Sequence, residues 1–239
     1  MSHLHIPDGL LPVWLWLAGM ALAMAAVLLS LYMVRGMDLR KKIPLLGMMS
    51  AMMLVGMNLE IAAIAYHVNL SVLTGIILGP WLAVVAALIV NVLLAVVGHG
   101  GVTVAGLNTI IVGSEAVVGY FLFSMFRRFL KPGMAAGVST FIALFVSTCM
   151  MLGVVVLANL DFSAPLAREM REVMETPTIA TLSGAFRMKE DFNLKFFAVS
   201  ALGLGAMGWF LESFITMVAV RFIAVVKPEI LKAGNVKRP

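Results

Sequence analysis

Long apolar runs separated by short polar or basic segments dominate the chain. An α-helix needs about 20 mostly apolar residues to cross the hydrocarbon core of a bilayer. We therefore predict an all-α integral membrane protein with about seven transmembrane helices, forming a single transmembrane domain over residues 1–239. The predicted helices span residues 9–34, 43–57, 61–78, 81–97, 108–126, 133–158 and 196–222.

The basic residues decide whether residues 61–97 cross the bilayer once or twice, a question that hydropathy leaves open. Lys and Arg gather in segments 35–42, 127–131 and 221–239, and cytoplasmic loops carry an excess of these residues. A double crossing with its turn at Gly79–Pro80 places all three segments inside the cell. The predicted topology therefore has its N-terminus outside and its C-terminus in the cytoplasm.

Composition agrees with a multi-pass protein of the cell membrane. Hydrophobic residues make up 62% of the chain and charged residues only 12%, against about 45–50% and about 25% in an ordinary soluble domain. The net charge of +5 fits basic cytoplasmic loops better than a nucleic-acid partner. A single cysteine, Cys149, excludes disulfides and thiolate metal sites. Because the chain has no Walker-type phosphate loop, another chain must bind the ATP of any active transport.

The predicted outer face collects the polar features of the chain. Residues 159–195 form the one long polar stretch, and we expect them to be an extracytoplasmic loop. All four histidines also fall on this side of the membrane, which favours a shared site. They are His3, His5, His67 and His99.

The N-terminal segment 1–9 is a candidate metal-binding segment. A free amine, a deprotonated backbone amide and an imidazole within a few residues can hold a divalent metal through adjacent nitrogens, an arrangement that suits Ni²⁺ and Cu²⁺. The alternative is a solvated tail. His67, at the expected end of a helix, is by itself more often hydrogen-bonded structure than a ligand. His99, in a glycine loop, is either a ligand, a supporting residue or a tolerated loop residue.

Three glutamates lie within or beside the apolar runs, at Glu60, Glu115 and Glu212. Carboxylates are costly in hydrocarbon and are functional candidates by default. They could relay protons, pair with cations or dock partner subunits, so a proton-coupled secondary transporter is the alternative function. An integral membrane enzyme with a histidine metal site is disfavoured, because the chain has no His-Glu-x-x-His helix or comparable array.

The motif His5-Ile6-Pro7-Asp8-Gly9 resembles the N-terminal signature of the CbiM/NikM family. These proteins are the substrate-binding membrane subunits of energy-coupling-factor transporters for cobalt and nickel. The likeness continues through residues 74–81 (TGIILGPW) and 98–103 (GHGGVT), and it covers most of the chain. Further matches are His67, residues 106–108, Glu212 and residues 225–231.

The resemblance implies a metal-capture subunit of an ATP-driven importer rather than an enzyme. It implies Ni²⁺ or Co²⁺ as transported substrate, for nickel enzymes or cobalamin synthesis, and no cofactor. The implied partners are a transmembrane coupling subunit, two ATPase subunits and a small auxiliary membrane subunit. In the family, the metal is held by the amino-terminal nitrogen, by the next residue's amide and imidazole, and by a second histidine. These roles fall on Leu4, His5 and His67, with His99 and Asn108 as supporting residues.

The chain departs from the family at its first residues. The family chain normally begins with Met directly before the signature histidine, whereas residues 1–3 precede Leu4 here. Three alternatives stay open: translation starts at Leu4, read as Met; the first Met is removed and residues 2–3 chelate; or the intact start binds through its amine, two amides and His3. The likeness favours His5, with His3 as the reserve ligand.

Overall fold

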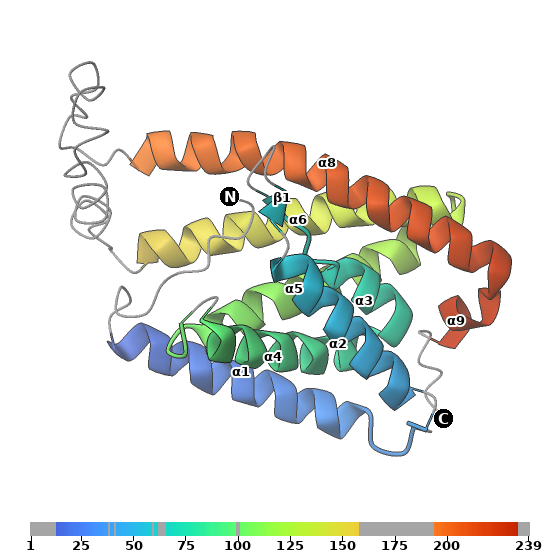
Figure 1. The fold of residues 1–239 in the computed structure, drawn as a ribbon, viewed down its shortest axis with the longest axis horizontal. Helices are drawn as coiled ribbons and strands as arrows, with labels where there is room; N and C mark the ends of the chain where they lie inside the picture. Colours follow the sequence, from blue (N-terminus) through green and yellow to red (C-terminus); the bar gives the residue numbers. More distant parts are fainter. Residues whose placement is uncertain are drawn as a thin grey trace.

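The computed structural model describes residues 13–37, 39–40, 42–58, 60–61, 66–98, 101–157 and 194–233, and these form a bundle of helices with one short hairpin (Figure 1). The elements in chain order are α1 (Val13–Met33), α2 (Lys42–Asn58), β1 (Glu60–Ile61), β2 (Tyr66–His67), α3 (Ser71–Leu78), α4 (Pro80–Val97), α5 (Ala105–Phe126), α6 (Pro132–Leu157), α8 (Leu194–Val226) and α9 (Pro228–Ala233).

Long apolar helices make this an all-α integral membrane protein, as predicted. Within the described residues, five helices are long and apolar enough to cross a bilayer: α1, α4, α5, α6 and the part of α8 over residues 205–226. The 17-residue α2 is a shorter apolar helix. Large side chains such as Leu28 on α1 and Phe210 on α8 are 59% and 66% exposed, which suits a surface that faces lipid. The number of crossings and the orientation of the termini stay predictions.

Helix α5 is the centre of the bundle. It contacts α1, α3, α4 and α6, while α6 and α8 lie side by side along one side and α1 and α4 along the other (Figure 1). Small residues permit the closest approaches, as is usual between membrane helices. A Cβ at Gly106 of α5, for example, would lie 2.6 Å from Cα of Met20 on α1.

The predicted helix over residues 61–78 is right only in its last part. Strands β1 and β2 pair antiparallel, with Glu60 opposite His67 and Ile61 opposite Tyr66. Leu70 has φ 58°, in the left-handed region, so α3 begins only at Ser71. At eight residues, α3 rises about 12 Å and cannot cross a bilayer alone. All of its residues are buried.

The helix break predicted at Gly79–Pro80 is present. Gly79 lies between α3 and α4 with φ 87°, a conformation that glycine adopts without steric cost. Pro80 opens α4, where its missing N–H would have had no partner in the helix. The chain therefore leaves α3 and starts α4 across a single residue.

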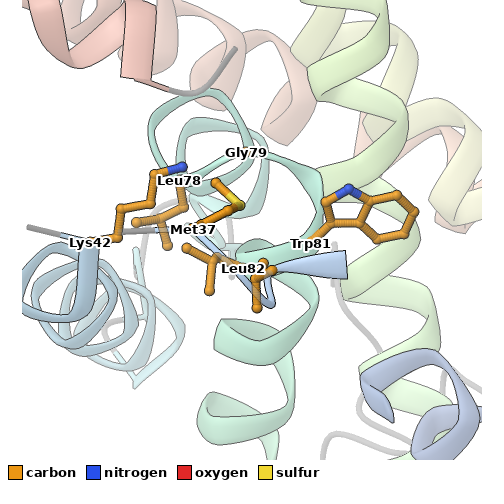
Figure 2. Close-up of a pocket in the computed structure, with 7 residues that line it drawn as sticks. Met37, Lys42, Leu78, Gly79, Trp81 and Leu82 are labelled. Carbon is orange, nitrogen blue, oxygen red and sulfur yellow. The ribbon is translucent and has the colours of Figure 1, made fainter. Parts of the chain in front are cut away.

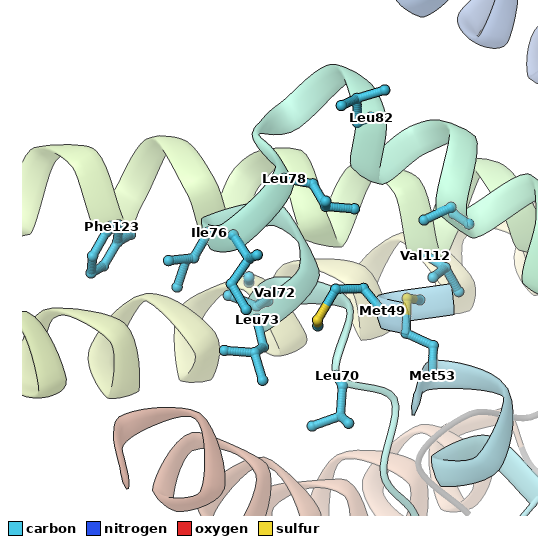
Figure 3. Close-up of a cluster of buried hydrophobic side chains, with 14 of the residues drawn as sticks. Met49, Met53, Leu70, Val72, Leu73, Ile76, Leu78, Leu82, Val112 and Phe123 are labelled. Carbon is cyan, nitrogen blue, oxygen red and sulfur yellow. The ribbon is translucent and has the colours of Figure 1, made fainter. Parts of the chain in front are cut away.

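The main hydrophobic core surrounds α3 (Figure 3). Met49 and Met53, one helical turn apart on α2, are each 1% exposed and belong to the same cluster as Leu73 and Ile76 of α3. Val112 adds side-chain volume from α5. Helix α3 also contacts α4, α6, α8 and α9, so most of the bundle holds it in place.

Candidate metal site

The structure describes two of the predicted metal-site residues, His67 and Asn108. His67 is half-buried in β2, and its Nδ1 atom is fully buried. Asn108 is 8% exposed in the first turn of α5. Among the described residues, no three His, Cys, Asp or Glu side chains gather as a metal-binding group. The predicted site residues that lie outside the described ranges are His3, Leu4, His5 and His99.

His67 lies in an extended hairpin, not at the end of a transmembrane helix as predicted. Its backbone pairs with Glu60 of β1. The next residue, Val68, packs against α2, where a Cβ at Gly56 would collide with the Val68 carbonyl oxygen. The histidine is therefore fixed by strand pairing on one side and followed by a segment that enters the bundle.

Glu212 on α8 accepts hydrogen bonds from the backbone of the segment that follows His67. The N–H of Asn69 donates to Oε2 of Glu212 at 3.2 Å, and the N–H of Leu70 donates to Oε1 at 2.8 Å. Glu212 is 0% exposed, so these are hydrogen bonds inside the bundle. A buried carboxylate is tolerated only when donors replace its water, and two adjacent N–H groups supply this replacement.

Glu115 on α5 accepts hydrogen bonds from side chains of the same segment. Nδ2 of Asn69 donates to Oε1 of Glu115 at 2.9 Å, and the hydroxyl of Ser71 donates to the same oxygen. The hydroxyl of Ser147 on α6 donates to Oε2 at 2.7 Å. Residues 69–71 are thus connected to α5 and α8 directly and to α6 through Glu115.

These bonds were not predicted from the sequence, although it contained a signal for them. The sequence places Glu115 and Glu212 within apolar runs and makes them functional candidates. Such carboxylates need donors nearby, and Asn69 and Ser71 are polar residues within an apolar run that can supply them. The partner Ser147 lies on another helix, and nothing in its own sequence neighbourhood indicates the contact.

Asn108 lies some distance from these bonds along the same helix. It precedes Glu115 by seven residues, which corresponds to a rise of about 10 Å along α5. It lies in the first helical turn after Val104, the N-cap of α5. The structure therefore places Asn108 at the start of α5, directly after residues 102–104.

A pocket lies at the other end of α3 (Figure 2). Apart from Lys42 its lining is apolar, and it contains no histidine or carboxylate. Because α3 rises about 12 Å between its ends, this pocket is separate from residues 67–71 and offers no metal ligands. The lining residues are Val34, Met37, Lys42, Leu78, Gly79, Trp81 and Leu82.

Comparison with known families and proteins assigns the chain to a class. Residues 5–230 match the family model CbiM, described as cobalt uptake substrate-specific transmembrane region. The chain belongs to this family, and it is a multi-pass protein of the cell membrane. The description names a component of metal uptake and not an enzyme.

Two curated relatives share this character. The chain is 28% identical over 235 residues to the cobalt transport protein CbiM of Kyrpidia tusciae, covering 95% of this chain and 86% of the relative. It is 29% identical over 136 residues to a Haemophilus influenzae protein whose name proposes a role in metal transport. That alignment covers 55% of this chain and 62% of the relative, so the chain matches less than two thirds of that protein.

Two solved structures have the same fold. A crystal structure of a transition metal transporter aligns with a TM-score of 0.73 at 18% identity, covering 96% of both chains. A truncated transition metal transporter aligns with a TM-score of 0.72 at 19% identity, covering 93% of this chain and 99% of the other. At these identities the likeness shows the shared fold.

Proposed function

We propose that this chain is the substrate-binding membrane subunit of an ATP-driven energy-coupling-factor importer for Co²⁺ or Ni²⁺. The observation that carries the proposal is the family match over residues 5–230. The relative in Kyrpidia tusciae is named as a cobalt transport protein, which supports a divalent transition metal as substrate. The metal is cargo that the subunit captures and releases.

The proposed metal site combines the amino-terminal segment with His67. An amino-terminal nitrogen, the amide and imidazole of His5 and the imidazole of His67 make a nitrogen donor set, which late first-row divalent metals accept well. The anchored segment after His67 supports this assignment, because a ligand on a fixed backbone needs little reordering when the metal binds. His3 is the reserve for His5, and His99 and Asn108 are supporting residues.

Transport in this proposal depends on other chains. Two ATPase subunits drive a reorientation of this chain through a transmembrane coupling subunit, and a small auxiliary membrane subunit completes the complex. The proton-coupled alternative would use Glu60, Glu115 and Glu212 and would need no ATPase. Glu115 and Glu212 are hydrogen-bonded to residues 69–71. Because this anchoring explains why two of the carboxylates are buried without a role in proton transfer, it favours the importer.

Native mass spectrometry of untagged protein, purified after growth with trace Ni²⁺ and Co²⁺, tests the proposal. It reports the first residue of the chain and any bound metal together. We expect one metal per chain in the purified wild type. His67→Ala and His5→Ala should lose the metal during purification because their affinity is lower, although excess Ni²⁺ can load them again, and His99→Ala should keep the metal with weaker affinity. If the chain starts at Ser2 and the His5→Ala variant still binds one metal, the site is at His3 instead.

Metal binding by the purified chain and metal uptake by cells together distinguish the importer from the proton-coupled transporter. Folded protein with an open amino terminus that binds neither metal would contradict the capture subunit. Metal uptake by cells that lack the ATPase subunits, abolished by loss of the glutamates, would establish the proton-coupled transporter instead. The importer predicts that uptake disappears when the ATPase subunits are deleted while metal still binds to the purified chain.

A further inference from the structure

We infer that Glu212 and Glu115 are positioning residues for His67: by holding residues 69–71 inside the bundle, they set where the histidine meets the metal. This inference rests on the proposed function. It concerns the two buried carboxylates, which the proposed metal site does not use as ligands. Both carboxylates bind the segment that directly follows His67.

The first step is the short distance in sequence between the histidine and its anchor. Asn69, whose N–H donates to Glu212, follows His67 by two residues. Two residues of chain span at most about 7 Å, so little backbone is available to absorb a displacement at Asn69 before it reaches the histidine. On the other side, pairing with Glu60 fixes the strand. The position of His67 thus follows from two restraints, of which the carboxylates are one.

The second step is the conformation of the anchored backbone. Leu70 is the one residue other than glycine with a positive φ in the described part of the chain. The left-handed conformation is unfavourable for leucine, so surrounding interactions must hold it. Successive N–H groups around such a residue can converge on an anion, and here those of Asn69 and Leu70 reach the two oxygens of Glu212. Removing one acceptor releases this backbone.

The third step distinguishes the two glutamates. A glutamine at 115 keeps Oε1 for Asn69 and Ser71, and its amide nitrogen can donate to the hydroxyl oxygen of Ser147. That hydroxyl already has a second acceptor, the carbonyl of Leu144 at 3.1 Å. A glutamine at 212 keeps one acceptor but presents an amide nitrogen to the second backbone N–H. Donor then faces donor, and one of the two backbone bonds is lost.

The structure therefore predicts unequal effects of two isosteric substitutions. Partners that orient metal-ligating histidines typically contribute 10–100-fold in metal affinity. We expect Glu212→Gln to weaken Ni²⁺ binding at least about 10-fold, and Glu115→Gln to weaken it by less than about 3-fold, because its hydrogen bonds can be remade. Ser213→Ala is the matched control, since the Ser213 hydroxyl on the same helix is buried and has no hydrogen-bond partner among the described residues.

The experiment is a Ni²⁺ titration of the untagged full chain by calorimetry, combined with the visible absorption spectrum of the loaded protein. Both are measured for wild type, the three variants and His67→Ala. A change in the spectrum of Glu212→Gln at saturating metal, toward that of His67→Ala, reports a displaced imidazole. Loss of general stability alone would leave the ligand set and the spectrum of the folded fraction unchanged.

A double-mutant cycle with His67→Ala decides whether Glu212 acts through the histidine. If it does, adding Glu212→Gln to His67→Ala costs no further affinity. Equal additional losses in both backgrounds would overturn the inference, as would wild-type affinity in Glu212→Gln. If Glu212→Gln does not yield folded protein, Glu212→Asp, which keeps two acceptor oxygens on a shorter side chain, takes its place in the same cycle.

Failure of the inference and failure of the proposed function give different results. Wild-type protein that binds Ni²⁺ through His67, with no sensitivity to residue 212, leaves the function standing and overturns the positioning role. Wild-type protein that binds neither Ni²⁺ nor Co²⁺ overturns both.

Discussion

At the scale of single residues, the polar groups inside the bundle are connected to one another across helices. Glu115 receives donors from the segment after His67 and from α6, and Glu212 receives the two backbone N–H groups before α3. In a low-dielectric interior, a satisfied network is strong and an unpaired member is costly. The residues that complete the network should therefore matter more than their size suggests.

Ser147 offers a direct test of this cost. Its hydroxyl contacts both Glu115 and the carbonyl three residues earlier, whereas Ser139 on the same helix bonds only to such a carbonyl. We expect Ser147→Ala to destabilise the protein by about 1–2 kcal/mol, and Ser139→Ala by much less. Thermal unfolding of the two variants in detergent measures the difference, and equal melting temperatures would contradict a structural role for the Ser147–Glu115 bond.

At the scale of elements, α3 is an inserted half-helix whose position depends on close contact with α5. A Cβ at Gly75 would collide with the backbone carbonyl of Ala116, and a Cβ at Gly119 would collide with Val72. Both glycines are next to the polar anchor at Glu115 in sequence or in space. The packing and the hydrogen bonds therefore restrain the same part of the chain.

Gly75→Ala should separate α3 from α5 and disturb the anchored segment. Overpacking of this kind costs about 1–3 kcal/mol, and we also expect weaker Ni²⁺ binding because residues 69–71 move with the helix. Gly153→Ala on α6 is the control, since a Cβ there meets nothing within 4 Å, and the gain in helix propensity makes it neutral or slightly stabilising. Comparison of melting temperature and Ni²⁺ affinity tests both expectations; a Gly75→Ala variant as stable as the control would contradict the close packing.

Comparison of sequence and structure at this scale shows what hydropathy can and cannot predict. The long helices and the break at Gly79–Pro80 follow from local information, because apolar length and backbone conformation are properties of the segment itself. Residues 69 and 70 do not, because their backbone is held by acceptors that are distant in sequence. The bond from Asn69 to Glu212 joins residues 143 positions apart, and no window of hydropathy contains both. The sequence indicates His67 as a candidate metal ligand and both glutamates as functional candidates, but it does not indicate that they are connected.

At the scale of the whole molecule, polar and apolar residues exchange the places that they have in a soluble protein. Asn69, Thr74 and Glu212 are 0% exposed, while Leu28 and Phe210 are more than half exposed. Lipid accepts the apolar surface, and helices that must satisfy every polar group internally collect those groups in the interior. One group of these polar residues, formed by Asn69, Ser71, Glu115, Ser147 and Glu212, lies around the start of α3, beside the one described histidine. Both glutamates that are buried in the described part of the chain thus bind the segment next to the proposed metal ligand His67.

The orientation of the bundle gives the last prediction. The predicted topology has the basic segments inside the cell. It therefore predicts that residue 102, before α5, is outside and that Lys131, before α6, is in the cytoplasm. Both side chains are exposed in the structure. Because Cys149 is the single cysteine and is itself exposed, Cys149→Ala provides a background in which Val102→Cys and Lys131→Cys can be compared. A membrane-impermeant thiol reagent applied to intact cells should label only Val102→Cys, and permeabilised cells should show both. The reverse pattern would invert the topology and place the histidines in the cytoplasm, which is incompatible with capture of metal from outside.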